Sequence, residues 1–320
     1  MPKPRPIAIL ASDIHLSQKP PIARSVEPNW FDVMSRQFDE LRMMQKKLDV
    51  PVIIAGDIFD RWNNPAELVN FAIDIMPEET YTIPGQHDLS YHNLSDIGKT
   101  SYWTLVKCGA IKSLQPSLLG TFKDVVNTIP LTSRLAVRGF PWGMIPDEQT
   151  AEDRLLYNEG RITLAVVHAY CWTGKLKYKD APKSNGVKRH MRMLKHYDAA
   201  VFGDNHKGFK HIGADGRQAL NCGTFFRRSI DERDYEPQVG ILHDNGSIEI
   251  HKLDVSKDIF IDVDDALKLI EKGLGIVDFV SQLKDWRAEM FDFKHAVARY
   301  IESSNVSKGV ARILREAMEG

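Results

Sequence analysis

The sequence predicts an α/β protein in which helices flank β-sheets, followed by a helical extension at the carboxyl end. Short apolar runs that predict buried strands alternate with longer segments whose apolar residues recur every three or four positions. Five of the strand-like runs lead directly into acidic, amide or imidazole side chains. In open α/β sheets, ligands gather outside the carboxyl ends of the strands. We therefore expect these five polar clusters to meet at one edge and to form the functional site.

The composition is that of an ordinary soluble globular protein. With 320 residues, the chain can form one large domain with an appendage or two modest domains. A formal net charge of -1 provides no overall attraction to nucleic acid or membranes, so any such affinity must be local. The three cysteines are far apart and form no CxxC pair, which favours a reducing compartment. Because no apolar run has the length of a signal-peptide core or a membrane span, we expect a cytoplasmic protein without membrane contact.

The first strand-like run, Ile7–Ala11, is followed by Asp13 and His15. In an extended segment, two side chains separated by one residue point the same way, so both could approach one ion. Alone, this pair is a weak signal, because an aspartate after a strand is usually a turn or cap residue. An amphipathic helix that packs on the sheet is predicted over Asn29–Leu48.

The second run, Val52–Ala55, leads into Gly56 and Asp57. A glycine before an acidic strand end lets the backbone approach an ion closely. Asp60 follows three residues later, and it either orients the ligands or forms a plain salt bridge with its neighbour Arg61. A second helix is predicted over 66–76.

The third run, Tyr81–Ile83, enters the sharp turn Gly85-Gln86-His87-Asp88. A carboxylate beside an imidazole can hold the ring in one tautomer, ready to donate a proton. We therefore expect Asp88 to orient His87.

The fourth run, 164–167, ends at His168, and the fifth, 199–202, leads into Gly203-Asp204-Asn205-His206. Between the third and fourth runs, the pattern predicts a helix near 99–108 and strands near 125–129 and 135–140. Trp142 follows the last of these strands and either lines a groove or is a half-buried core residue. Further strands are predicted over 219–224, 238–242 and 247–253, with a hairpin turn at 244–246, and we expect them to complete a second sheet.

The segment between Trp172 and Tyr197 is strongly basic and contains only one acid, Asp180. Because it connects two strand ends that carry polar clusters, we expect it to pass near the site as a loop that includes Gly186. A basic segment with aromatic residues suits a nucleic-acid backbone, although a solvated basic face is the alternative. The predicted DNA-binding residues are Lys175, Lys177, Lys188, Arg189, Arg192 and Lys207.

The order and spacing of the five clusters resemble the signature of the calcineurin-like metallophosphoesterases over roughly residues 7–225. Within that superfamily, the run Gly56-Asp57-Ile58-Phe59-Asp60 and the helical carboxyl end resemble most the nuclease subunits of SbcCD-type double-strand-break repair complexes and their phage counterparts. The resemblance implies a sandwich of two mixed β-sheets flanked by helices. We therefore predict a catalytic domain over 1–255 and a helical extension over 256–320.

The resemblance also implies a site for two divalent metal ions with a defined set of ligands. Carboxylate, imidazole and amide ligands without a thiolate suit Mn²⁺ or a similar ion. The residues that match the ligands of the first ion are Asp13, His15, Asp57 and His206. Those that match the ligands of the second ion are Asp57, which would bridge both, Gln86, His168 and Asp204. His87 matches the residue that assists the leaving group, and Asp60 and Asn205 are expected to support the ligands.

Two positions depart from the family pattern, and both belong to the second ion. The family usually has asparagine where Gln86 stands and histidine where Asp204 stands. Glutamine places its amide oxygen one methylene further out, and aspartate replaces a neutral nitrogen with an anionic oxygen. The two changes either compensate each other or leave the second site weak.

The implied function is that of a phosphodiesterase, specifically a DNA exo- or endonuclease subunit of a recombination or repair complex. Its implied partners are DNA and an SMC-like coiled-coil ATPase that binds the carboxyl-terminal helices, and it could also form a homodimer. Packing of these helices on the catalytic domain is the alternative for that segment. Two other functions stay open: a stand-alone phosphoesterase of nucleotides or small phosphoesters, and a non-catalytic assembly subunit with a degenerate second metal site.

Overall fold

The computed structural model describes residues 3–114, 129–144, 160–178 and 181–262. The chain divides into two compact units, one formed by residues 1–177 and 183–261 and the other by 178–182 and 262–320. The first unit contains every predicted site residue and is described below. The predicted helices beyond 262, and most of the predicted strand at 125–129, lie outside the described residues.

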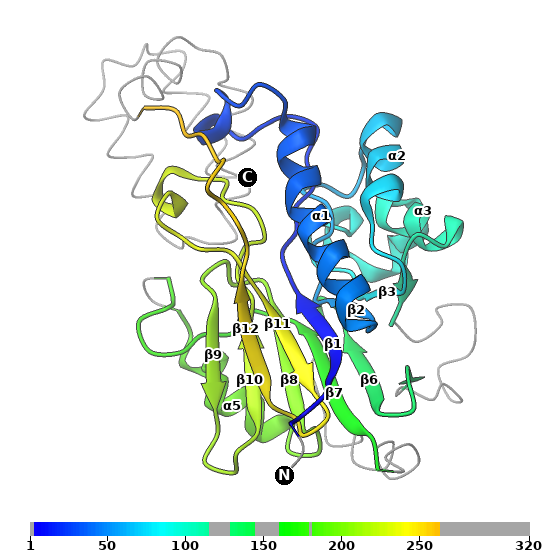
Figure 1. Ribbon diagram of the computed structural model, residues 1–320, viewed down its shortest axis with the longest axis vertical. Helices are drawn as coiled ribbons and strands as arrows, with labels where there is room; N and C mark the ends of the chain where they lie inside the picture. The colour runs from blue at the N-terminus through cyan, green and yellow to red at the C-terminus, as the bar shows by residue number, and fades with distance from the viewer. Residues whose placement is uncertain (1–2, 115–128, 145–159, 179–180, 263–320) are drawn as a thin grey trace. The chain divides into compact units, whose positions relative to one another are not determined.

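Within the described residues, the first unit contains two six-stranded mixed sheets, which confirms the predicted sandwich class (Figure 1). In the first sheet, β1, β2, β3 and β4 are parallel, and β11 runs antiparallel to β1. The order of its strands is β12 (Ile248–Lys252), β11 (Gln238–His243), β1 (Pro6–Ala11), β2 (Val52–Ile54), β3 (Thr80–Thr82) and β4 (Lys112–Ser113).

In the second sheet, β6, β7, β8 and β10 are parallel, and the two edge strands are antiparallel to their neighbours. The order of its strands is β5 (Ile129–Pro130), β6 (Leu135–Phe140), β7 (Ile162–His168), β8 (Ala199–Gly203), β10 (Gln218–Asn221) and β9 (Phe209–Ile212). The polar clusters follow parallel strands of both sheets, so their side chains all leave at carboxyl ends.

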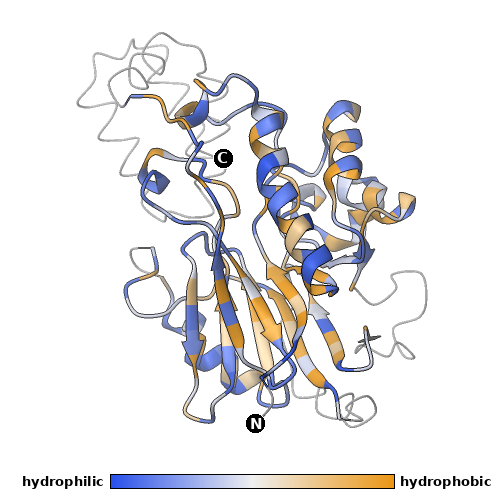
Figure 2. Cartoon of the chain, in the orientation of Figure 1, coloured by the Kyte–Doolittle hydropathy of each residue, from blue (hydrophilic) through white to orange (hydrophobic). Residues whose placement is uncertain are grey.

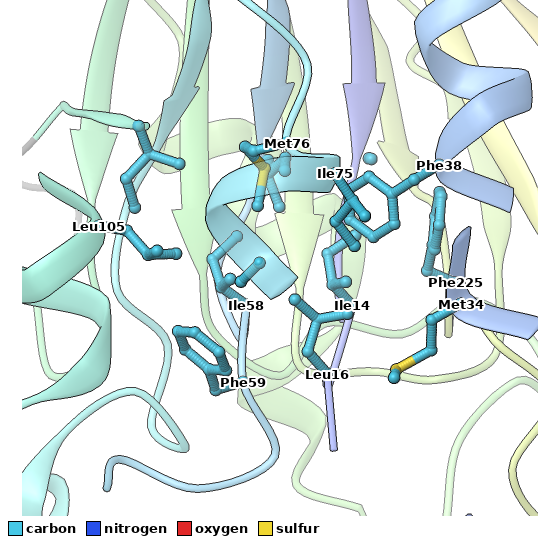
Figure 3. Close-up of a cluster of buried hydrophobic side chains, with 14 of the residues drawn as sticks. Ile14, Leu16, Met34, Phe38, Ile58, Phe59, Ile75, Met76, Leu105 and Phe225 are labelled. Carbon is cyan, nitrogen blue, oxygen red and sulfur yellow. The ribbon is translucent and has the colours of Figure 1, made fainter. Parts of the chain in front are cut away.

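Helices α1 (Trp30–Leu48), α2 (Ala66–Ile75) and α3 (Ser101–Cys108) lie beside the first sheet (Figure 1). Helix α1 begins after Asn29, whose side chain accepts a hydrogen bond from the backbone N–H of Phe31. Its buried stripe packs against the first sheet and the loops that follow its strands, as the cluster around Phe38 in Figure 3 shows. The periodicity of the sequence predicted these helices because each has one apolar face.

Alternate residues of the strands face different layers of the core. In β1, Ile9 faces the helices, whereas Leu10 faces the second sheet. In β7, Val166 faces the first sheet, whereas Val167 packs towards α5 (Val187–Met193) on the outer side of the second sheet. Figure 2 shows the result as hydrophobic colour along the central strands of both sheets. Burial of strands on both faces explains why they appear in the sequence as continuous apolar runs.

Three features of the fold differ from the sequence-based expectations. The strands β11 and β12 join the first sheet beside β1, and not the second sheet. The short strand β9 was not predicted, and the basic segment contains α5 directly after Gly186 instead of forming only a loop.

Gly240 of β11 lies opposite Leu10, where a β-carbon would come within 2.3 Å of the Leu220 side chain of the second sheet. A period-two pattern identifies a strand but not the sheet that it joins.

Within the part of the chain that the structure describes, none of the helices has both the length and the apolar character needed to cross a membrane.

Candidate metal centre

The carboxyl ends of β1, β2, β3, β7 and β8 bring the polar clusters together. The backbone N–H of His15 donates to the carbonyl of Asp57 at 2.9 Å, which joins the first two clusters. The backbone N–H of Asp204 donates to Asp13 Oδ1 at 2.8 Å, which joins the two sheets. Sequence-distant residues thus form one buried site, as the strand-end pattern predicted.

Four of the predicted ligands adopt left-handed backbone conformations. The φ angles are 50° at Asp13, 52° at His15, 53° at Asp57 and 85° at Asp204. Residues other than glycine adopt such angles at a cost of about 1–3 kcal/mol each, and such residues cluster at functional sites. Their concentration at these strand ends indicates that the fold tolerates a loss of local stability in order to place these four side chains in the site.

Glycines at the strand ends allow the ligands to approach one another. A β-carbon on Gly85 would lie 2.1 Å from Asp57 Oδ1, and one on Gly56 would lie 2.2 Å from His168 Nδ1. Gly56 also has a φ of +90°, which glycine adopts without steric cost. These positions therefore exclude any larger residue while the ligands keep their places.

The first group of candidate ligands contains Asp13, His15 and His206, whose ligand atoms lie within 4.8 Å of one another. The Nε2 atoms of His15 and His206 are 3.0 Å apart, and Asp57 Oδ2 lies 3.7 Å from His15 Nε2. Burial lowers the pKa of His15 well below its ordinary value, and positive neighbours such as Arg228 lower it further. His15 is therefore neutral at physiological pH, the state in which an imidazole nitrogen can bind a metal.

The second group centres on His168, whose Nδ1–H donates to the carbonyl of Ala55 at 2.6 Å. This hydrogen bond leaves Nε2 facing Gln86 Oε1 at 2.5 Å and Asp57 Oδ2 at 3.3 Å. The amide nitrogen of Gln86 donates to Asp204 Oδ1 at 2.6 Å. The two residues that depart from the family pattern are thus paired with each other, and the Gln86 oxygen lies beside the other ligands of this group.

The described residues fit divalent cations because they bury negative charge without enough donors. Asp13 Oδ2 and Asp57 Oδ2 are buried, and neither accepts a hydrogen bond within the described part of the chain, although His168 Nε2 lies 3.3 Å from Asp57 Oδ2. Burial raises the pKa of Asp13 to about 6. Burial acts in the same direction on Asp57, but attraction to His168 and His87 outweighs it and lowers the pKa of Asp57 to about 2. Both carboxylates are therefore ionised at neutral pH, and an unpaired buried carboxylate oxygen is costly unless a cation compensates it.

Metal binding is expected to release protons from His168. Burial would lower the pKa of His168, but the carboxylates of Asp57, Asp13 and Asp204 outweigh burial and raise it to about 10. At pH 7.5, which is below that pKa, Nε2 of the metal-free protein carries a proton, and this proton must leave before Nε2 can bind a metal. Titration calorimetry with Mn²⁺ in two buffers of different ionisation enthalpy should show release of about one proton or more per chain. His168→Asn should release fewer protons, and an enthalpy independent of the buffer would contradict the assignment of His168 as a ligand.

His87 lies beside the first group, with its ring centroid 4.8 Å from that of His15. Its Nδ1–H donates to the backbone carbonyl of Asp60 at 2.9 Å, which leaves Nε2 as the nitrogen for proton transfer. Its backbone N–H donates to Asp57 Oδ1 at 2.9 Å. His87 is therefore connected to the carboxylate that lies between the two ligand groups.

The structure corrects the role expected of Asp88. Its carboxylate does not contact the His87 ring but accepts hydrogen bonds from the backbone N–H groups of Ile58, Phe59 and Gly85, at 3.2, 3.1 and 3.0 Å. Burial, followed by repulsion from Asp57, raises the pKa of Asp88 to about 7. Asp88 thus fixes two neighbouring strand-end loops, and the Asp60 carbonyl takes the orienting role.

Arg228 is a site residue that no motif in the sequence indicates. Its guanidinium pairs with the Asp60 carboxylate, which also lies 3.8 Å from His15 Nδ1. The backbone N–H of Arg228 donates to Glu232 Oε2 at 2.5 Å, so its place in the loop is fixed. Asp60 therefore links Arg228 to His15 through its carboxylate and to His87 through its carbonyl.

Asn205 supports the site by connecting it to the basic segment. Its amide nitrogen donates to the carbonyls of Cys171 at 2.8 Å and Leu176 at 3.0 Å. Lys175 and Lys177 flank Leu176, and Lys207 is exposed next to His206. These three lysines therefore lie beside the loop that carries Asp204 and His206.

The basic residues of α5 are not all near the site. The helix begins beside Trp172, whose carbonyl accepts a hydrogen bond from the Val187 N–H at 2.8 Å. At its other end, Arg217 donates to the carbonyl of Met191 at 3.1 Å, and Arg217 directly precedes β10. The end of α5, which carries Arg192, therefore lies at the amino ends of the parallel strands, about one strand length from the ligands. Lys188 and Arg189 lie in its first turn, nearer to Trp172.

Comparison with known proteins identifies the family. The family described as calcineurin-like phosphoesterase matches residues 8–208 of this chain. A search of curated proteins found no significant match. Among solved structures, the calcineurin-like phosphoesterase YfkN from Bacillus subtilis has 12% sequence identity and a TM-score of 0.47, with coverage of 85% of this chain and 97% of that chain. A dimetal phosphatase from Danio rerio has 10% identity and a TM-score of 0.44, with coverage of 81% and 99%.

The match to the family spans most of the unit that holds the site, from β1 to the loop after β8. Calcineurin-like phosphoesterases are two-metal hydrolases, and the candidate ligand groups lie at the strand ends within the matched region. The chain belongs to the calcineurin-like phosphoesterase family.

Proposed function

We propose that this protein is a two-metal phosphodiesterase that cleaves DNA as the exo- or endonuclease subunit of a recombination or repair complex. The observation that carries the hydrolytic part is the place of Asp57. Its Oδ2 atom lies 3.7 Å from His15 Nε2 and 3.3 Å from His168 Nε2, between the two ligand groups. Two divalent ions, for which we propose Mn²⁺, would activate a water and neutralise charge on the phosphoryl oxygens.

The residues of the chain have separate tasks in this reaction. Asp57 holds the two ligand groups in one geometry, and Gln86 connects His168 to Asp204. His87 would give a proton to the leaving oxygen, because the Asp60 carbonyl keeps the hydrogen on Nδ1 and directs Nε2 to this task. The pairing of Gln86 with Asp204 supports a functional second metal site over a degenerate one.

The proposal that the substrate is DNA is supported by positive charge beside the loop that carries Asp204 and His206, called the ligand loop below. Lys175 and Lys207 are exposed, and Lys177 lies 4.7 Å above the Trp172 ring. Asn205 connects this group to the ligand loop through its hydrogen bond to Leu176. Lysines at such a site neutralise backbone phosphates, and the aromatic ring adds a surface for a base or a sugar.

Neutralising the lysines beside the site is expected to weaken DNA binding. The double variant Lys175→Gln/Lys207→Gln should lower the affinity for single-stranded DNA. It should also reduce the magnitude of the slope of log binding constant against log salt concentration by about 1.4, because each phosphate contact contributes roughly 0.7. The matched control is Arg192→Gln/Lys195→Gln, which removes two exposed charges at and just beyond the carboxyl end of α5. Fluorescence anisotropy at several salt concentrations measures both slopes. Equal slopes for the two double variants would contradict the placement of DNA beside the ligand loop.

The segment beyond the described residues is where we propose that an SMC-like ATPase partner binds. The described chain up to Ile261 belongs to the first unit. Asp258 pairs with the buried Arg24 at 2.9 Å, and the backbone N–H of Ile261 donates to the carbonyl of Ala23 at 2.9 Å. Arg227 also pairs with Asp258 at 2.9 Å. We therefore place the start of a partner-binding extension after Ile261.

The experiment that tests the proposed function is degradation of end-labelled single- and double-stranded DNA in the presence of Mn²⁺, with Asp57→Asn as the blank. Cleavage by the natural protein and none by the variant is the expected result, and the product ladder gives the polarity. Hydrolysis of a small diester without cleavage of DNA would favour the stand-alone phosphoesterase. If neither DNA nor the small diester is hydrolysed, the isolated chain does not contain a working two-metal centre.

A further inference from the structure

A half-buried tryptophan lies directly beside the second ligand group. Trp142 follows β6 by two residues, and its backbone N–H donates to the carbonyl of Pro84 at 3.2 Å. This bond ties the exit of β6 to the turn that carries Gln86 and His87. The Trp142 ring centroid lies 6.4 Å from that of His168, with the planes at 66°. That is the spacing of aromatic rings in direct contact, so the indole forms a wall of the site.

A second aromatic group extends this wall towards solvent. The ring of His92 lies 6.3 Å from that of Trp142, and its neighbour in the sequence, Tyr91, is 86% exposed. Both residues have left-handed φ angles, 48° at Tyr91 and 57° at His92. A bulky side chain such as tyrosine rarely adopts this conformation. The exposed ring of Tyr91 is therefore maintained despite an unfavourable backbone conformation.

The exposure of Tyr91 does not arise from a loosely packed turn. The preceding residues Leu89 and Ser90 are 2% and 4% exposed, and the His92 N–H donates to the Leu89 carbonyl at 3.1 Å. On the other side, the Asn93 side chain caps the next short helix by accepting a hydrogen bond from Ser95 N–H. The turn is thus anchored at both ends, and it begins directly after the His87-Asp88 pair.

We propose that Trp142, His92 and Tyr91 form a subsite that stacks nucleobases of the substrate next to the second ligand group. This inference rests on the proposed function and adds that the enzyme recognises unpaired bases as well as phosphates. Aromatic rings stack on every base without regard to sequence, so such a subsite favours single-stranded or frayed nucleic acid. Because Trp142 contacts the His168 ring, the base on Trp142 and the phosphate at the ligands belong to the same or neighbouring nucleotides.

The test compares a six-nucleotide thymidine strand with an abasic strand of the same length and charge. Binding is measured by fluorescence anisotropy with Mn²⁺ present, in a His87→Gln background that slows hydrolysis. The unaltered subsite should bind the thymidine strand at least about tenfold more tightly than the abasic strand. Trp142→Leu and Tyr91→Gly should each lower this ratio about fivefold or more, while affinity for the abasic strand stays the same.

Tyr91→Gly and two further variants decide between stacking and a loss of folding. Tyr91→Gly suits the left-handed backbone and removes only an exposed ring, so the fold is preserved. Tyr91→Phe should keep the full ratio because the ring remains. Trp103→Leu, a half-buried tryptophan on α3, should also keep it.

The outcomes separate this inference from the proposed function. If both strands bind equally, or if Trp142→Leu and Tyr91→Gly leave the ratio unchanged, the stacking subsite is wrong while DNA binding stands. If neither strand binds, the proposed function fails and the subsite with it. If Trp103→Leu lowers the ratio as much as Trp142→Leu does, the effect is not local and the subsite is also overturned.

Discussion

Asp57→Asn is expected to abolish phosphodiester hydrolysis and to prevent the binding of two ions together. The substitution keeps the shape of the side chain but removes the charge that lies between the two ligand groups. Asparagine also replaces one oxygen with an amide nitrogen, which cannot bind a cation. Loss of metal-mediated charge stabilisation is worth several kcal/mol, so activity should fall by roughly 10³-fold or more.

Two measurements check this expectation independently of turnover on DNA. Hydrolysis of a small chromogenic diester gives the activity, and the rise in melting temperature on addition of Mn²⁺ gives the binding. The natural protein should be stabilised by Mn²⁺, because an ion that binds only the folded state stabilises it by mass action, and Asp57→Asn should show little stabilisation. Asp96→Asn is the control, since Asp96 pairs only with Lys99 at the surface among its described contacts. An Asp57→Asn variant that keeps both responses would refute the bridging role.

His87→Gln is expected to lower kcat by about 10²–10⁴-fold while leaving metal binding intact. The backbone N–H of His87 donates to Asp57 Oδ1, and its ring donates to the Asp60 carbonyl. These two hydrogen bonds position His87 at the metal centre, although it is not one of the predicted ligands. Glutamine fills similar space but cannot transfer a proton at neutral pH. Mn²⁺ titration should therefore give the same stoichiometry as for the natural protein.

The leaving group gives the sharper check on His87. A p-nitrophenolate leaves without much need of protonation, whereas an alkoxide needs a proton from a general acid. The loss caused by His87→Gln should consequently be small for a p-nitrophenyl diester and large for an alkyl diester or DNA. An equal loss on both classes of substrate would show that His87 acts by another route, such as binding the phosphoryl group.

The residues that the sequence predicted well are those whose signal is local. An apolar run followed directly by Asp13, Asp57 or His168 predicts both the strand and the side chain at its end. Parallel pairing then brings these ends to one edge, so the site follows from topology without any knowledge of side-chain contacts. The two-sheet sandwich was predicted through the family resemblance and is confirmed by the structure.

The features that the sequence could not give depend on contacts between distant segments. Nothing near Asp60 indicates that Arg228 pairs with it, and nothing in the His87-Asp88 dipeptide indicates that Asp88 turns to the backbone of Ile58 and Phe59. The same holds for the pairing of β11 with β1, because the alternating pattern of β11 does not identify its partner strand. The orientation of α5 likewise decides which basic residues lie near the site, and the spacing of charges in the sequence does not indicate that orientation.

The two-ion assignment is tested most directly by anomalous diffraction from crystals soaked in Mn²⁺. We predict two peaks about 3.5–4 Å apart, the separation typical of two-metal phosphoesterase sites, with Asp57 in contact with both. Gln86, His168 and Asp204 should surround the peak further from His206. A single peak near Asp13 and His206, with none beside Gln86 and His168, would show that the exchange of the family's asparagine and histidine for Gln86 and Asp204 has removed the second metal.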